Sequence, residues 1–105
     1  MSTSTNPKGV ILHDDKTEIV KAVVPDEIKA KEGEVVEWVV LPSHLPVTVT
    51  FSSETGSPFD SPLKGRNPKG KVKKGAGGFI LYKDYKYTVE DNKGNKIDPH
   101  LRVRK

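Results

Sequence analysis

Apolar and polar residues alternate with a period of two along most of this chain, and apolar residues do not recur at helical spacing over any useful length. Ile28 and Ala30 alternate with lysines, and Val36, Trp38 and Val40 share one parity in the most apolar segment. Because successive side chains of a strand point to opposite faces of a sheet, this alternation is typical of half-buried strands. The pattern predicts an all-β protein.

Prolines, glycines and other turn residues interrupt the alternation about every 8–12 residues, which is the spacing of turns in an all-β domain. We therefore expect about seven or eight short strands in an antiparallel Greek-key β-sandwich. Residues 1–9 are polar and predict a flexible tail, which leaves residues 10–105 as a single domain. The stretch from Ser52 to Pro68 is expected to be a long irregular connection anchored by Phe59 and Leu63.

The tyrosines fall on two predicted faces. Tyr85 and Tyr87 share parity with Phe79, Leu81 and Val89, so these five side chains are expected to face the core. Tyr82 falls on the opposite face, where its ring could stack on a nucleic-acid base beside lysines.

The chain has no cysteine, which excludes disulfides, thiolate metal sites and a cysteine nucleophile. His13 lies beside two aspartates near the amino terminus and is expected to be exposed with them. The acidic pair Glu90 and Asp91 falls in a predicted turn, where carboxylates are normally solvated rather than catalytic. We therefore expect a protein that is not an enzyme.

Positive charge is concentrated in the second part of the chain. Residues 1–60 carry five basic and ten acidic residues, a net charge of −5, whereas residues 61–105 carry 13 basic and four acidic residues, a net charge of +9. The densest basic run consists of Lys64, Arg66, Lys69, Lys71, Lys73 and Lys74. Such a run attracts nucleic acid, anionic lipid or an acidic protein, and it also serves simply to keep a surface soluble.

Four segments occur in an informative order. Residues 23–38 read VVPDEIKAKEGEVVEW, residues 46–51 read PVTVTF, residues 85–89 read YKYTV, and residues 97–103 read IDPHLRV. In this order they resemble the cupredoxins, the plastocyanin-like β-sandwiches, with their I-x-V-x-x-G-[DE]-x-V-x-W, P-H-x-V-x-F and Y-x-[FY]-x-C strands and their last loop and strand. The resemblance covers roughly Thr17 to Val103, and it implies a fold that usually carries copper for electron transfer.

The resemblance implies a copper site of two histidines, a cysteine and usually a methionine, but this chain has other residues at those positions. The first histidine position falls on Val47, the cysteine position on Val89 and the methionine position near Ile97. The second histidine position falls in the turn of Asn92 and Lys93. Because the soft thiolate defines a blue-copper site, the resemblance implies a domain that has lost its copper ligands and has no resident cofactor.

We therefore expect a non-enzymatic cupredoxin-like module, a binding or accessory protein whose partner is an unidentified protein or an anionic molecule. One alternative is a copper- or zinc-binding, or electron-transfer, protein that uses His44 and His100, which lie near the family's ligand positions. Another is a nucleic-acid binder that uses the basic run. We expect a monomer without a membrane span, cytoplasmic by default, or periplasmic or secreted if the sequence is that of a mature chain.

Overall fold

The computed structural model describes residues 8–53, 56–59, 63–78 and 81–105. They contain ten strands, which are β1 (Gly9–His13), β2 (Val20–Val24), β3 (Glu27–Lys31), β4 (Val35–Leu41), β5 (Val47–Phe51), β6 (Leu63–Gly65), β7 (Lys69–Lys71), β8 (Lys83–Asp91), β9 (Lys96–Ile97) and β10 (His100–Arg104). Within these ranges, no helix is long and apolar enough to cross a membrane. Residues 1–7 of the expected tail lie outside the described residues, and Gly9 belongs to β1.

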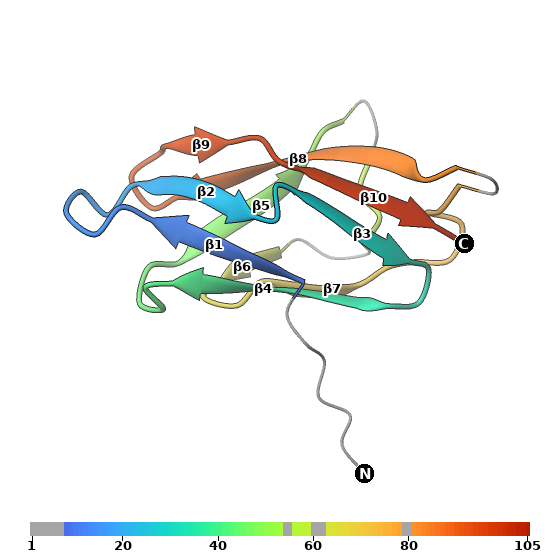
Figure 1. Ribbon diagram of the computed structural model, residues 1–105, viewed down its shortest axis with the longest axis horizontal. Helices are drawn as coiled ribbons and strands as arrows, with labels where there is room; N and C mark the ends of the chain where they lie inside the picture. Colours follow the sequence, from blue (N-terminus) through green and yellow to red (C-terminus); the bar gives the residue numbers. More distant parts are fainter. Residues whose placement is uncertain (1–7, 54–55, 60–62, 79–80) are drawn as a thin grey trace, which may run out of the picture.

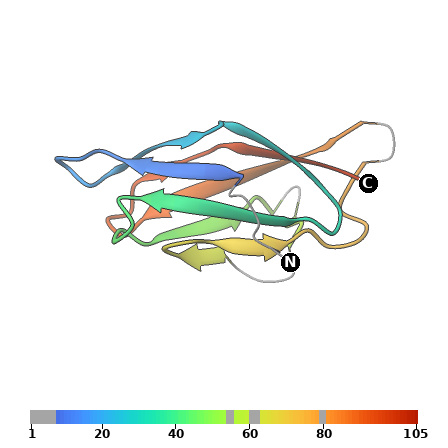
Figure 2. The ribbon, with the colours of Figure 1, turned by 60° about the horizontal axis from the view of Figure 1, so that its bottom comes forward.

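The strands form two sheets that pack face to face, as Figure 1 and Figure 2 show from two sides. One sheet has four strands in the order β2-β1-β4-β7. The other has six, in the order β3-β10-β8-β5-β6, with β9 paired to β8. The all-β sandwich that the alternation predicts is therefore confirmed.

Two features of the sheets differ from the expectation. The structure has more strands than the seven or eight expected, because β6 and β9 are only three and two residues long and leave no readable alternation. Two pairings are parallel, between β1 and β4 and between β3 and β10, so the sheets are mixed rather than wholly antiparallel. Parallel neighbours need a long connection, and here β2 and β3 lie between β1 and β4 in the chain, while β4 to β9 lie between β3 and β10.

The residues of one parity fill the space between the sheets. Trp38 is fully buried and Tyr87 is 1% exposed, and the Trp38 Nε1–H donates a hydrogen bond of 3.1 Å to the Tyr87 hydroxyl oxygen. Phe59 and Leu63 are buried, which confirms their expected role as anchors of the long connection. Tyr85 is also buried, as its parity predicts, whereas Phe79 of the same parity lies outside the described residues. The core is therefore built by the alternation that the sequence shows.

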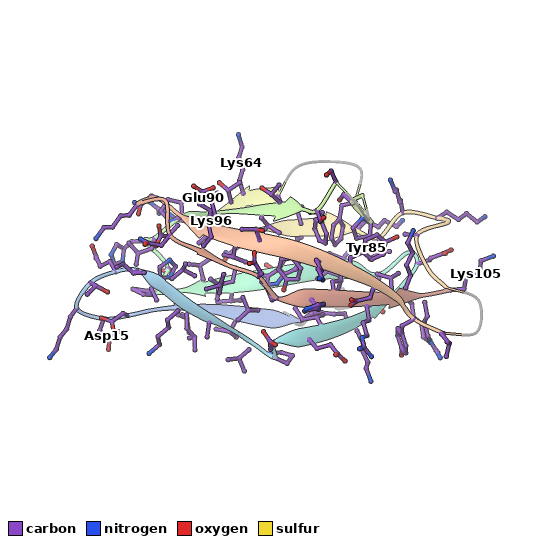
Figure 3. The ribbon with its side chains drawn as sticks, turned by 90° about the horizontal axis from the view of Figure 1, so that it is seen from above. Asp15, Lys64, Tyr85, Glu90, Lys96 and Lys105 are labelled. Atoms are coloured by element: carbon purple, nitrogen blue, oxygen red, sulfur yellow. The ribbon has the colours of Figure 1, made fainter. Side chains whose placement is uncertain are left out.

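The sandwich has two ends, which are named here by their turns. The β8–β9 end gathers the β1–β2 loop, the β4–β5 loop and the turn after β8, because β1, β4 and β8 all run toward it. The β3–β4 end gathers the β3–β4 turn, the connection after β7 and the end of β10. Figure 3 shows Asp15 at the first end and Lys105 at the second.

Candidate functional site

The three expected copper positions lie close together at the β8–β9 end. Val89 lies in β8 between two strands, with Val49 of β5 on one side and Ile97 of β9 on the other. Val47 begins β5 and lies opposite Asp91, two residues further along β8. The structure thus brings together the positions that the family resemblance singles out.

Aliphatic side chains make this place part of the core. Val89 is fully buried, Val47 is 3% exposed, and Ile97 packs against the core while partly exposed. Burying a valine or isoleucine side chain contributes about 1.5–3 kcal/mol to folding. These residues offer no nitrogen, oxygen or sulfur atom to a metal, so they do not fit the copper ion that the family resemblance implies.

Asp91 is the most heavily bonded side chain at the β8–β9 end, and sequence reasoning missed it. It is 5% exposed, and its carboxylate accepts hydrogen bonds from the backbone amides of Val20 (3.0 Å), Lys93 (2.8 Å) and Asn95 (2.9 Å). Burial alone would raise the pKa of Asp91, but these amides favour the carboxylate and lower its pKa overall. The expectation of a solvated turn residue is wrong, because Asp91 connects the turn after β8 to β2.

His13 is also buried, at 3% exposure, so the expected exposed cluster with the neighbouring aspartates is wrong. The parity of β1 places His13 on the inward face with Ile11. Its Nδ1 lies 3.3 Å from the Leu41 carbonyl oxygen, and its Nε2 has no hydrogen-bond partner among the described residues. His13 therefore lies within the core packing at this end.

The structure does not bring His44 and His100 together. The His44 Nε2 lies 3.2 Å from Glu18 Oε2 in the loops of the β8–β9 end. The His100 Nδ1 lies 3.1 Å from Asp84 Oδ2 on the outer face of the six-stranded sheet. His100 lies opposite Lys86, which is five residues before the last residue of β8. At the rise of a β-strand, these five residues place His100 about 17 Å from the β8–β9 end. Across the described ranges, no three His, Asp or Glu side chains gather closely enough to hold a metal ion.

The basic run is divided between the two sheets. Lys64 lies in β6 opposite Thr48, and Arg66 follows in the turn after β6, so both belong to the β8–β9 half of the molecule. Lys69 and Lys71 lie in β7 of the four-stranded sheet. Figure 3 shows Lys64 and Lys105 in different parts of the molecule. The six basic residues are therefore spread over the edge strands of both sheets.

Part of the run surrounds a hollow at the β3–β4 end. This hollow has a volume of about 580 Å³ and is lined by Glu32, Gly33, Lys71, Val72, Lys73, Lys74 and Lys105. Sequence reasoning missed the contribution of Lys105, which the end of β10 brings beside the connection after β7. We call this feature the lysine hollow.

Glu32 is the acidic member of the lysine hollow. Its Oε2 accepts a hydrogen bond of 2.8 Å from the backbone amide of Gly77. The amides of Gly77 and Gly75, together with the charges of Lys105 and Lys74, lower the pKa of Glu32. Four lysines against one glutamate leave the hollow with an excess of positive charge.

Leu81 and Tyr82 lie just before β8, and only one of them is on the face that the sequence predicts. Leu81 is 78% exposed, so the expectation that it faces the core is wrong, because β8 begins only at Lys83 and the parity does not extend before it. Tyr82 is exposed as expected, but the cations near its ring are Lys29 at 5.5 Å and Arg104 at 6.0 Å, rather than members of the basic run.

The ten strands form an all-β sandwich of two sheets. Comparison with solved structures shows that its fold is cupredoxin-like, since it matches amicyanin, a cupredoxin, in a structure of a mutant in its reduced Cu(I) form at pH 4. The match has a TM-score of 0.52 and 12% sequence identity, and it covers 97% of this chain and 87% of that chain. No family model and no curated protein sequence match the chain. The likeness therefore establishes the fold.

Proposed function

We propose that this protein is a non-enzymatic cupredoxin-like module without a blue-copper site, and that it binds an acidic segment of a partner protein in the lysine hollow. One observation carries the proposal: Lys71, Lys73, Lys74 and Lys105 surround a single hollow about 580 Å³ in volume. Converging ammonium groups create a positive potential that attracts carboxylates and speeds the encounter with an acidic partner.

The chemistry of the copper positions supports the first part of the proposal. A blue-copper site needs a thiolate, and the chain has no cysteine to supply one. The cysteine position is Val89, which has no exposed surface and packs between β5 and β9. Electron transfer through copper would therefore need a site of a different kind.

The alternative metal site has no geometric support. It needs the imidazoles of His44 and His100 on one ion, and each of them is paired with a carboxylate in a different part of the molecule. The nucleic-acid alternative also loses its aromatic platform, because Tyr82 lies with Lys29 and Arg104 rather than with the run from Lys64 to Lys74.

The lysine hollow gives the acidic segment a defined place. Gly77 already satisfies Glu32 with a backbone amide, so that carboxylate is held by the protein and does not need the surrounding lysines for hydrogen bonding. Val72 also lines the hollow, but it is only 1% exposed, so the surface offered to a partner is mainly that of the lysines. An extended segment with several glutamates or aspartates would fit this lining.

The test measures binding of a labelled polyglutamate peptide by fluorescence anisotropy. The triple variant Lys71→Gln, Lys73→Gln, Lys74→Gln is expected to weaken binding at least about tenfold, because it removes three of the four cations of the hollow. Binding to the wild type should fall as salt screens the charges.

The matched control removes the same charge elsewhere. The triple variant Lys16→Gln, Lys86→Gln, Lys96→Gln changes exposed lysines outside the hollow and should change the affinity by less than about twofold. Equal weakening by both triple variants would show attraction by net charge alone and contradict the proposal. Tighter binding of a labelled oligothymidine of equal charge would favour the nucleic-acid alternative instead.

A further inference from the structure

The outer face of the four-stranded sheet carries a block of aliphatic side chains. Val10 of β1 lies between Val24 of β2 and Val39 of β4 in the register of the sheet. Directly opposed residues in neighbouring strands point to the same face, so these three valines form one row. They point away from the core, because their neighbours in the chain, such as Ile11, point into it.

A second row lies beside the first. Leu12 of β1 is opposite Ala22 of β2 and Leu41 of β4. The two rows together make an aliphatic patch that is three strands wide, consisting of Val10, Leu12, Ala22, Val24, Val39 and Leu41. Figure 2 shows β1 and β4 side by side where this patch lies. Val24 is 53% exposed and Leu41 46% exposed, at opposite corners of the patch, and the other four side chains are partly exposed.

The outer face of the six-stranded sheet is polar and differs from the aliphatic patch. Its outward residues in β3, β5, β8 and β10 are all charged or polar: Glu27, Lys29, Lys31, Thr48, Thr50, Asp84, Lys86, Thr88, Glu90, His100, Arg102 and Arg104. A sheet with one face in water normally alternates apolar and polar residues in this way. The aliphatic patch is therefore a feature of one sheet rather than of the composition, and contiguous apolar surface of this kind marks an interaction site.

One pair of opposite charges flanks the patch, with a lysine beyond β4 and an aspartate beyond β2, although exposed Lys21 also lies on the β2 border. Lys69 and Lys71 lie along one border, in β7, with Lys69 opposite Glu37 and therefore one row beyond Val39. Asp26 comes two residues after Val24, on the other border, and is exposed. A twofold axis parallel to the strands exchanges the two borders, so it would bring Lys69 to Asp26 of the partner subunit while the aliphatic rows meet.

We propose that the aliphatic patch is the contact between two copies of this chain, packed sheet against sheet about a twofold axis parallel to β1. The patch is aliphatic throughout and so matches a second copy of itself in chemistry, and Lys69 on one border matches Asp26 on the other in charge. A patch of three strands and two rows gives an interface at the small end of the known range, so we expect a dimer with a dissociation constant of about 10–500 µM. This proposal differs from the monomer expected from the sequence, and it rests on other observations than the lysine hollow, although Lys71 borders both features.

Sedimentation equilibrium over protein concentrations from about 10 µM to about 1 mM tests the proposal. The wild type is expected to approach a dimer at the highest concentrations. The double variant Val24→Thr, Leu41→Gln should raise the dissociation constant at least about tenfold, because it places polar groups at two exposed corners of the patch. Thr50→Gln, on the outer face of the six-stranded sheet, is the matched control and should leave the dimer unchanged.

A charge exchange tests the orientation of the two copies. Lys69→Glu alone and Asp26→Lys alone should each weaken the dimer, and the two together should restore it, because the exchanged pair has the same attraction. A wild type that stays monomeric at every concentration would overturn the proposal. Binding of that monomer to an added anionic lipid vesicle or to polyglutamate would not rescue it. A dimer that the Val24→Thr, Leu41→Gln variant does not weaken would also overturn the proposal, and failure of the exchange would overturn the twofold arrangement. Circular dichroism confirms that each variant is folded.

Discussion

Asp91→Ala is expected to lower the free energy of unfolding by about 3 kcal/mol. The carboxylate accepts hydrogen bonds from the backbone amides of Val20, Lys93 and Asn95. Alanine would leave the buried amide of Val20 without an acceptor, and one unsatisfied buried donor costs about 1–3 kcal/mol. The two amides of the turn are only partly buried and add less, since water can reach them. Urea unfolding followed by the fluorescence of Trp38 measures the change.

The loss should depend on pH. The folded pKa of Asp91 lies below its ordinary value of 3.8, so the carboxylate contributes stability above that value, and this contribution is lost as the pH falls through the folded pKa. The stability difference between wild type and Asp91→Ala should therefore be full near neutral pH and shrink below about pH 4. Asp15→Ala, at an exposed position of the β1–β2 loop, is the matched control. Equal destabilisation by both variants would contradict the role assigned to Asp91.

Gly77→Ala is expected to be similarly costly, by about 3 kcal/mol, for a steric reason. A Cβ atom at Gly77 would lie 2.3 Å from the carbonyl carbon of Arg104 and 2.6 Å from its oxygen. These are backbone atoms of the strand end, so relief requires the connection after β7 to move away from β10. The movement would also break the hydrogen bond from the Gly77 amide to Glu32 and disturb the lysine hollow.

Gly94→Asn is the matched control. It distinguishes the steric effect at Gly77 from the general effect of replacing a glycine on stability. Gly94 has a φ of 88°, which asparagine tolerates, and a Cβ there meets no atom within 4 Å. The control should lose less than about 1 kcal/mol in the same urea unfolding experiment. If Gly77→Ala is as stable as the control, the packing between the connection and Arg104 is not as described.

The sequence predicted the fold because the same alternation that forms each strand also decides which face is buried. Ile28, Ala30, Val36, Trp38 and Val40 are all buried as their parity requires. The alternation extends over whole strands here, so local information was enough to predict two apolar layers. The strands β6 and β9 escaped notice because three and two residues are too few to show a period.

The residues that reasoning misplaced are those whose partners are distant in the sequence. Asp91 looks like an ordinary turn residue until Val20, 71 residues away, is brought to it. His13 looked exposed because of its acidic neighbours, whereas the register of β1 turns it inward. The separation of His44 from His100 and the addition of Lys105 to the basic run have the same origin. Each depends on strand order and register, which a local pattern does not contain.

The aliphatic patch shows the same limit in another way. Val10, Val24 and Val39 come from three separate strands, and nothing in the chain places them in one row. Their alignment needs an antiparallel pairing on one side of β1 and a parallel pairing on the other. The sequence predicted only antiparallel pairs, so the patch could not be seen before the register was known.

Titration of the purified chain with Cu(II), followed by visible absorption and by NMR of valine methyl groups, tests whether the family's copper positions belong to the aliphatic core. We expect no intense charge-transfer band, no stoichiometric binding and unmoved methyl signals for Val47 and Val89, because aliphatic side chains occupy the ligand positions. Weak and separate effects at the exposed imidazoles of His44 and His100 are compatible with this result. Tight binding of one ion that shifts the methyl signals of Val89 would contradict it.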